Sequence, residues 1–253
     1  MTSAGQRILL HIFSSTYSAG MESVPFSRDD IRKAAGEIGV SVPKNLGAPI
    51  YDYRSHATIP EIESTAPDGK KWVIRSKASD RYAFELASWS YTDFDQTLLT
   101  TEIPDATPEI ILAASRNDEQ ALLAKIRYNR LADIFLGLTT YSLQSHLRTN
   151  LPNGAQAEVD EVYVAIGSDG KQYIIPVEAK GERERIGIVQ VEQSLAVCEM
   201  KWPGYTPIAI GVQPLSDDCI AMFKFGFSEG GSSGEVKKIG ERHYRLASHA
   251  AAN

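Results

Sequence analysis

The sequence predicts an α/β protein in which a mixed β-sheet is flanked by helices and a small module of helices and a β-hairpin comes first. Three observations predict this. The 253 residues are 43% apolar and 23% charged, as in ordinary globular proteins. Helical spacing and strand-like runs alternate after residue 115. The chain is longer than most single domains, so we expect two domains, 1–105 and 106–253.

The first predicted helix lies in "PFSRDDIRKAAGEIGV", residues 25 to 40. Ser27 can cap its N-terminus, with Asp30 three residues later as the partner acid. Gly39 ends the helix. The apolar residues between them recur at helical spacing: Ile31, Ala34, Ala35 and Ile38.

Turns and short elements fill the rest of the first module. "SVPKNLGAP" (41 to 49) is turn-rich because two prolines interrupt it. A second, short helix is expected near Ile59. "KWVIR" and "RYAFEL", joined by a short polar loop, predict a β-hairpin. Helix, turn, short helix and hairpin in this order form the outline of a winged helix.

A linker and a long helix are predicted next. "TEIPDATPEI" carries two prolines without periodicity, which indicates a linker from about 101 to 108. Asn117 and Asp118 then mark the start of a helix, and Gly137 marks its end. The apolar residues of this helix lie near one stripe: Leu122, Leu123, Ile126, Leu131, Ile134 and Phe135.

The remainder of the second domain is predicted mainly as strands. Runs 157–166 and 172–180, joined by the turn "GSDGK", predict an antiparallel hairpin. Helical spacing returns over 188–201. The other expected elements are strands at 206–215 and 220–228, a flexible Gly/Ser loop at 229–235, and a last strand around "KKIGERHYRL".

Composition excludes several functional classes. The net charge of −6 argues against coating nucleic acid by bulk electrostatics, although cationic residues cluster at 75–81, 125–130 and 180–185 and permit an anionic partner. Cys198 and Cys219 have no metal-ligand spacing, so neither a disulfide framework nor a zinc site is expected. Phosphate-loop and H-E-x-x-H motifs are absent from the sequence.

The sequence also bears on location. No run approaches the ~20 apolar residues of a membrane span. The N-terminal stretch "MTSAGQRILLHIF" is too short and polar for a secretory signal. We therefore expect a cytoplasmic protein without membrane contact.

Acidic residues on the predicted hairpin suggest chemistry. Because strand side chains alternate between faces, Glu178 and Lys180 point the same way at the end of the apolar run "YIIPV". On the partner strand, Glu158 and Asp160 share one face and Glu161 lies on the other. If Asp160 stands beside Glu178, two carboxylates and an ammonium converge.

Two carboxylates in a partly dry site repel each other unless a cation joins them. Mg²⁺ takes hard oxygen ligands and commonly only one or two protein carboxylates, completing its shell with water and phosphate oxygens. Such a site suits phosphodiester hydrolysis, with the lysine stabilising developing charge or orienting the attacking water.

This pattern resembles the PD-(D/E)XK nuclease superfamily, whose core is a mixed sheet flanked by helices. The resemblance covers roughly residues 115 to 215, with Val159-Asp160 in place of Pro-Asp and Glu-Ala-Lys as the E-x-K element. It implies that Asp160 and Glu178 bind Mg²⁺, with Mn²⁺ as the alternative, and that Lys180 is the catalytic lysine.

Two further residues follow from the same resemblance. Glu119, at the start of the long helix, matches the position where many members add another acid. Gln190, on the helix after the E-x-K strand, matches a supporting glutamine, as does Gln193.

The first module resembles the winged-helix domains that some restriction endonucleases carry ahead of this core, with "PKN" and "YDYR" in the corresponding positions. Its candidate DNA-binding residues are Arg28, Lys33, Lys44, Asn45 and Arg54.

Simpler interpretations accompany these assignments. Glu178 and Lys180 can be a solvated ion pair, and Glu119 can be a favourable acid near a helix N-terminus. A register shift of one residue would exchange the strand faces and replace Asp160 by Glu158 or Glu161.

The resemblance implies a metal-dependent endonuclease of the type II restriction kind that cuts double-stranded DNA as a homodimer, because two cuts need two sites. One alternative is a DNA repair or junction-resolving nuclease. The other is a non-enzymatic winged-helix DNA-binding regulator.

Overall fold

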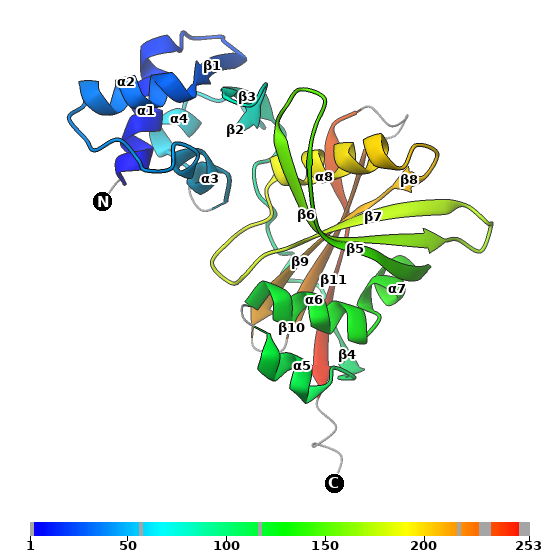
Figure 1. The fold of residues 1–253 in the computed structure, drawn as a ribbon. Helices are drawn as coiled ribbons and strands as arrows, with labels where there is room; N and C mark the ends of the chain where they lie inside the picture. The colour runs from blue at the N-terminus through cyan, green and yellow to red at the C-terminus, as the bar shows by residue number, and fades with distance from the viewer. Residues whose placement is uncertain (1–2, 56–57, 116–117, 217–218, 228–233, 248–253) are drawn as a thin grey trace. The chain divides into compact units, whose positions relative to one another are not determined.

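A computed structural model describes residues 3–55, 58–115, 118–216, 219–227 and 234–247. The chain divides into two compact units (Figure 1). Unit 1 comprises Met1–Tyr91, Asn150–Gln156 and Gly187–Val189, and unit 2 comprises Thr92–Thr149, Ala157–Ile186 and Gln190–Asn253. The described part of the chain contains no helix long and apolar enough to cross a bilayer.

Unit 1 packs four helices against a small antiparallel sheet of strand order β1-β3-β2. Aromatic and aliphatic side chains, including the fully buried Trp72 and Phe84, form its core. Its elements are α1 (Ala4–Thr16), β1 (Ser23–Ser27), α2 (Arg28–Glu37), α3 (Ala48–Ser55), α4 (Pro60–Glu63), β2 (Lys71–Ser76) and β3 (Arg81–Ala87).

Several predictions for this unit are confirmed. Helix α2 begins after Ser27, which forms a capping box with Asp30, because each residue's side chain accepts from the other's backbone N–H. The short helix near Ile59 is α4. The hairpin is β2 and β3, paired antiparallel with Trp72 opposite Leu86.

Three elements of unit 1 were not predicted. Helix α1 buries Ile8, Leu9, Ile12 and Phe13 on one face. This helical spacing was not used for prediction, because the N-terminal stretch was considered only as a possible secretory signal. Strand β1 comes directly before α2. Helix α3 begins inside the segment expected to be turn, because a proline such as Pro49 is tolerated in a first helical turn.

Unit 2 is a curled mixed sheet flanked by helices, which confirms this part of the predicted fold class (Figure 1). The described strands form one sheet of order β4-β11-β10-β9-β7-β6-β5, with β8 beside β7. Its elements are β4 (Thr100–Pro104), α5 (Glu109–Ala114), α6 (Asp118–Tyr128), α7 (Leu131–Leu136), β5 (Thr139–Asn150), β6 (Gln156–Ile166), β7 (Gln172–Ala179), α8 (Ile188–Lys201), β8 (Thr206–Pro207), β9 (Ala209–Ser216), β10 (Cys219–Phe227) and β11 (Val236–Ala247).

Strand directions make the sheet mixed. β6 and β7 are antiparallel, as are β9, β10 and β11, whereas β7 runs parallel to β9 and β4 parallel to β11. Helices α6 and α7 cover one face, where Leu123, Ile126 and Leu131 pack with sheet residues such as Val177 and Val212. The predicted hairpin, the helix 188–201 and the three C-terminal strands are confirmed, while most of the Gly/Ser loop lies outside the described residues.

Two predictions for unit 2 are wrong. The long helix breaks at Arg130, which has a left-handed backbone (φ 50°), into α6 and α7. The break coincides with Asn129, whose amide binds the preceding segment by accepting from Ala106 N at 2.7 Å and donating to Thr107 Oγ1 at 2.9 Å. The predicted linker contains β4, which pairs with β11, and its Pro104 is tolerated because β4 is an edge strand.

Candidate functional site

The hairpin register determines which acids meet. Glu161 on β6 pairs with Val177 on β7 as the last pair of this ladder, so Asp160 and Glu178 are the next residues on the two strands. The Asp160 carboxylate accepts a hydrogen bond from Ala179 N at 2.8 Å. The structure therefore brings Asp160 to the end of β7 where Glu178 and Lys180 lie.

Glu178 is a buried acid, with 4% of its surface exposed. Burial raises the pKa of its carboxyl from 4.5 to about 8, and the neighbouring Asp160 charge adds to the rise. The pKa of Asp160 is raised as well, chiefly by burial, although its hydrogen bond from Ala179 and the Lys180 charge oppose the rise. Two adjacent acids that both resist ionisation form a site that a cation would stabilise.

Lys180 is also buried, with 6% of its surface exposed, and its backbone N–H donates to Val212 O at 3.0 Å. This bond continues the pairing with β9 one residue past the end of β7 and fixes the backbone position of Lys180. Lys180 Nζ lies 4.0 Å from Glu119 Oε1 on α6. The structure thus brings together Glu119 and the three hairpin residues that sequence reasoning assigned to one site.

Helix α8 supplies a hydroxyl that sequence reasoning missed. Ser194 Oγ donates to Glu178 Oε1 and lies 2.9 Å from Gln190 O. The predicted Gln190 is half-buried one helical turn before Ser194, and its backbone carbonyl accepts a hydrogen bond from the Ser194 hydroxyl. The i, i+4 spacing of Gln190 and Ser194 on one helix face was the available signal.

Glu184 is a second residue that the sequence analysis does not assign to the site. It lies in "KGERER" (180–185), which the sequence analysis treats as a cationic cluster. Burial raises the pKa of Glu119, and the charges of Asp160 and Glu184 add to the rise while the Lys180 ammonium opposes it. Glu184 therefore lies among the charged groups that surround Glu119.

The alternative acids lie elsewhere. Glu161 faces the opposite side of the sheet, where it is fully buried and accepts from Arg127 Nη2 at 2.8 Å and Ser142 Oγ at 2.8 Å. Glu158 is more exposed and pairs with Arg148 at 3.0 Å. Neither takes the place of Asp160 beside Ala179.

We expect Arg127→Ala to lower the free energy of unfolding by about 2 kcal/mol, because it leaves the Glu161 carboxylate buried without its cation. Urea denaturation measures this change. The double variant Arg127→Met, Glu161→Met should recover most of the loss, since no unpaired charge remains. A single variant within about 0.5 kcal/mol of the wild type would contradict this expectation.

The donor set at the hairpin fits a hard divalent cation. Asp160 and Glu178 offer carboxylate oxygens from adjacent strands, which matches the one or two protein carboxylates that Mg²⁺ uses. The described residues contain no group of three or more His, Cys, Asp or Glu side chains that could hold a metal ion, so a site built wholly from protein ligands is not indicated among them.

The predicted DNA-binding residues fall into two sets within unit 1. Lys33, Lys44 and Asn45 are exposed, with Lys33 Nζ 3.8 Å from Glu37 and Asn45 Oδ1 accepting from Gly47 N. Arg28 and Arg54 instead line one cleft. The structure thus separates two arginines from the remaining candidates.

No family model matches the sequence, and comparisons with curated proteins and with solved structures return no match. The function is therefore inferred from the chemistry of this chain's own residues.

Proposed function

We propose that this protein is a metal-dependent DNA endonuclease of the PD-(D/E)XK type. The observation that carries the proposal is the hydrogen bond from Ala179 N to Asp160, which brings the Asp160 carboxylate to the strand end bearing Glu178 and Lys180. A mixed sheet flanked by helices, the architecture of that superfamily, supports it.

The chain's own residues have distinct tasks in this proposal. Asp160 and Glu178 would hold Mg²⁺ or Mn²⁺, which when bound polarises a phosphoryl oxygen and acidifies water. Lys180 supplies a fixed positive charge for the developing negative charge on the scissile phosphate. Glu119 lies 4.0 Å from this ammonium, and the attraction between the opposite charges helps to hold the lysine side chain at the site.

Ser194 has a positioning task. Its hydroxyl donates to Glu178 from the next helix, and such a hydrogen bond to a ligating carboxylate fixes the orientation of the carboxylate. Ser194 touches neither phosphate nor water in this scheme.

Unit 1 is proposed to bind the duplex as a winged-helix-like domain. Its order of helix, strand, three helices and an antiparallel pair of strands supports this, as do exposed cations on and after α2. Cutting both strands with one kind of site requires two copies, so we also propose a homodimer.

Plasmid digestion tests the proposal. The purified chain should linearise supercoiled plasmid with Mg²⁺ or Mn²⁺ and not with EDTA. Sequencing of the product ends distinguishes a restriction enzyme, with one recurrent sequence, from a repair or junction nuclease, which would cut branched DNA selectively. Metal-independent DNA binding without any cleavage would overturn the nuclease proposal and favour the regulator.

A further inference from the structure

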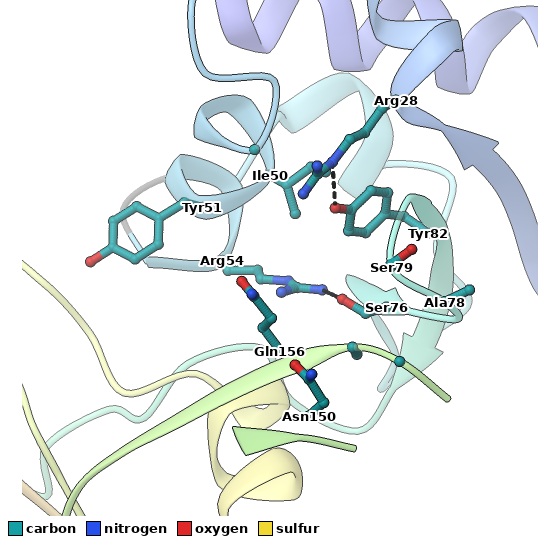
Figure 2. Close-up of a pocket in the computed structure, with 13 residues that line it drawn as sticks. Arg28, Ile50, Tyr51, Arg54, Ser76, Ala78, Ser79, Tyr82, Asn150 and Gln156 are labelled. Atoms are coloured by element: carbon teal, nitrogen blue, oxygen red, sulfur yellow. Dashed lines mark hydrogen bonds between the residues drawn. The ribbon is translucent and has the colours of Figure 1, made fainter. Parts of the chain in front are cut away.

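A cleft of about 430 Å³ lies in unit 1, and all thirteen residues that line it belong to that unit (Figure 2). It lies between the start of α2, helix α3, the β2–β3 loop and the segment 150–156. None of the lining residues is acidic, and two are arginines. The charge of the lining therefore favours an anionic ligand.

The two arginines are held in place by neutral partners. Arg28 Nε donates to Tyr82 Oη at 3.2 Å. Arg54 donates from Nε to Ile74 O at 2.7 Å and from Nη2 to Ser76 Oγ at 3.1 Å. Figure 2 shows the hydrogen bonds from Arg28 to Tyr82 and from Arg54 to Ser76 as dashed lines. Guanidinium groups held in advance lose less freedom when they bind a phosphate.

The segment 150–156 adds amide groups to the same cleft. It turns tightly, with Leu151 N donating to Ala155 O at 2.8 Å, and Gly154 has a left-handed backbone (φ 78°) that glycine adopts without strain. Asn153 Nδ2 donates to Ser76 O at 3.3 Å and fastens this turn to β2. Asn150 and Gln156, the first and last residues of this segment, both line the cleft.

Volume and chemistry together specify the ligand class. A cleft of this size is in the range of small-ligand sites and larger than a lone phosphate needs. Arginine binds phosphate oxygens in bidentate fashion, whereas Asn and Gln amides match the donors and acceptors of a base edge. Phosphate-binding and base-reading groups thus line one space.

We propose that this cleft binds a single nucleotide, with the phosphate on Arg28 and Arg54 and the base beside Asn150 and Gln156. The inference rests on the proposed function only for the source of that nucleotide, which is DNA if the chain is a nuclease. Arg28 and Arg54 would therefore bind a nucleotide inside the cleft, whereas Lys33 and Lys44 would contact a duplex from the surface.

Calorimetric titration of the full chain in EDTA tests the pocket. Deoxynucleoside 5′-monophosphates should bind at least about tenfold more tightly than the matching nucleosides and than inorganic phosphate, because only they engage both sets of groups. Arg28→Gln and Arg54→Gln should each weaken monophosphate binding about tenfold or more.

The variants have matched controls. Arg32→Gln removes an equal charge from an exposed position on α2 outside the cleft and should bind as the wild type does. Because Arg54 also donates a hydrogen bond to β2, thermal melting checks that the Arg54→Gln variant is folded. Arg28 is exposed and provides an independent variant. Monophosphate binding that is absent, or equal in wild type and Arg28→Gln, would overturn the proposal, as would equal affinity for inorganic phosphate.

Competition distinguishes the sources of the nucleotide. Unlabelled DNA that displaces the monophosphate from wild type identifies a nucleotide within DNA, and the absence of displacement identifies a free nucleotide in the same pocket. Metal-dependent cleavage unaffected by Arg28→Gln, together with no nucleotide binding, would remove this inference and leave the nuclease proposal standing. Nucleotide binding without DNA cleavage would support the nucleotide cleft and remove the nuclease proposal.

Discussion

Glu178→Gln and Lys180→Ala are each expected to reduce plasmid cleavage by about 100- to 1000-fold or more at pH 8 with saturating DNA. Glutamine keeps the size of the side chain and removes the negative charge that would hold the metal. Alanine at 180 removes the positive charge that would lie beside the scissile phosphate, and loss of one such electrostatic contact costs about this much. Initial rates of supercoiled plasmid conversion measure both.

Matched controls lie on the same hairpin and just after it. Glu182→Gln removes an exposed carboxylate four residues after Glu178, and Lys171→Ala removes an exposed lysine at the other end of β7. Both should cut at the wild-type rate. Excess Mn²⁺ should partly rescue Glu178→Gln, whose defect lies in metal binding, and not Lys180→Ala. Cleavage by either site variant at the rate of its control would show that the hairpin is not the active site.

The hairpin was predictable because local signals fixed its register. The turn closes with Gly167 N donating to Lys171 O at 2.8 Å, and Gly170 takes the left-handed conformation that glycine favours there. On β6 the buried Val159 and Glu161 alternate with the less buried Glu158 and Asp160, so the faces follow from the sequence. Once the turn is placed, the positions of both acids follow.

What could not be predicted depends on contacts between distant segments. The break at Arg130 accompanies the binding of Asn129 to residues about twenty positions earlier, which no helical periodicity reports. Strand β5 was missed because its residues are mostly exposed, so an apolar alternation is lacking. The cleft requires segment 150–156 to meet α3 and β2, a pairing that is invisible in a single sequence.

Stability of the metal-free protein is expected to fall as pH rises, and Glu178 is the reason. Its pKa is about 8 in the folded protein and 4.5 ordinarily, so between these values the unfolded chain has lost a proton that the folded chain keeps. Stability therefore decreases with rising pH across this window and levels off above about pH 8. The Lys180 charge and the Ser194 hydroxyl oppose this effect, whereas Asp160 strengthens it.

The contacts of Ser194 can accommodate either protonation state of Glu178. Its oxygen is within hydrogen-bonding distance of both Glu178 Oε1 and Gln190 O, and one hydroxyl proton cannot serve both acceptors fully. A protonated Glu178 can donate to Ser194 while Ser194 donates to Gln190. When Glu178 ionises, the hydroxyl proton must be shared or turned toward the carboxylate.

Glu178→Gln should consequently be more stable than wild type by about 4 kcal/mol at pH 8 in EDTA and nearly equal to it at pH 4.5, because glutamine never ionises. Urea denaturation at a series of pH values measures the difference. Adding Mg²⁺ at pH 8 should stabilise the wild type and leave the variant unchanged, since a ligand stabilises only the state that binds it. Parallel pH profiles for the two proteins would mean that Lys180 neutralises an ionised Glu178 in the absence of metal. Glu178 and Lys180 would then form a stable ion pair, whereas divergent profiles identify Glu178 and Asp160 as a pair of acids that a cation must complete.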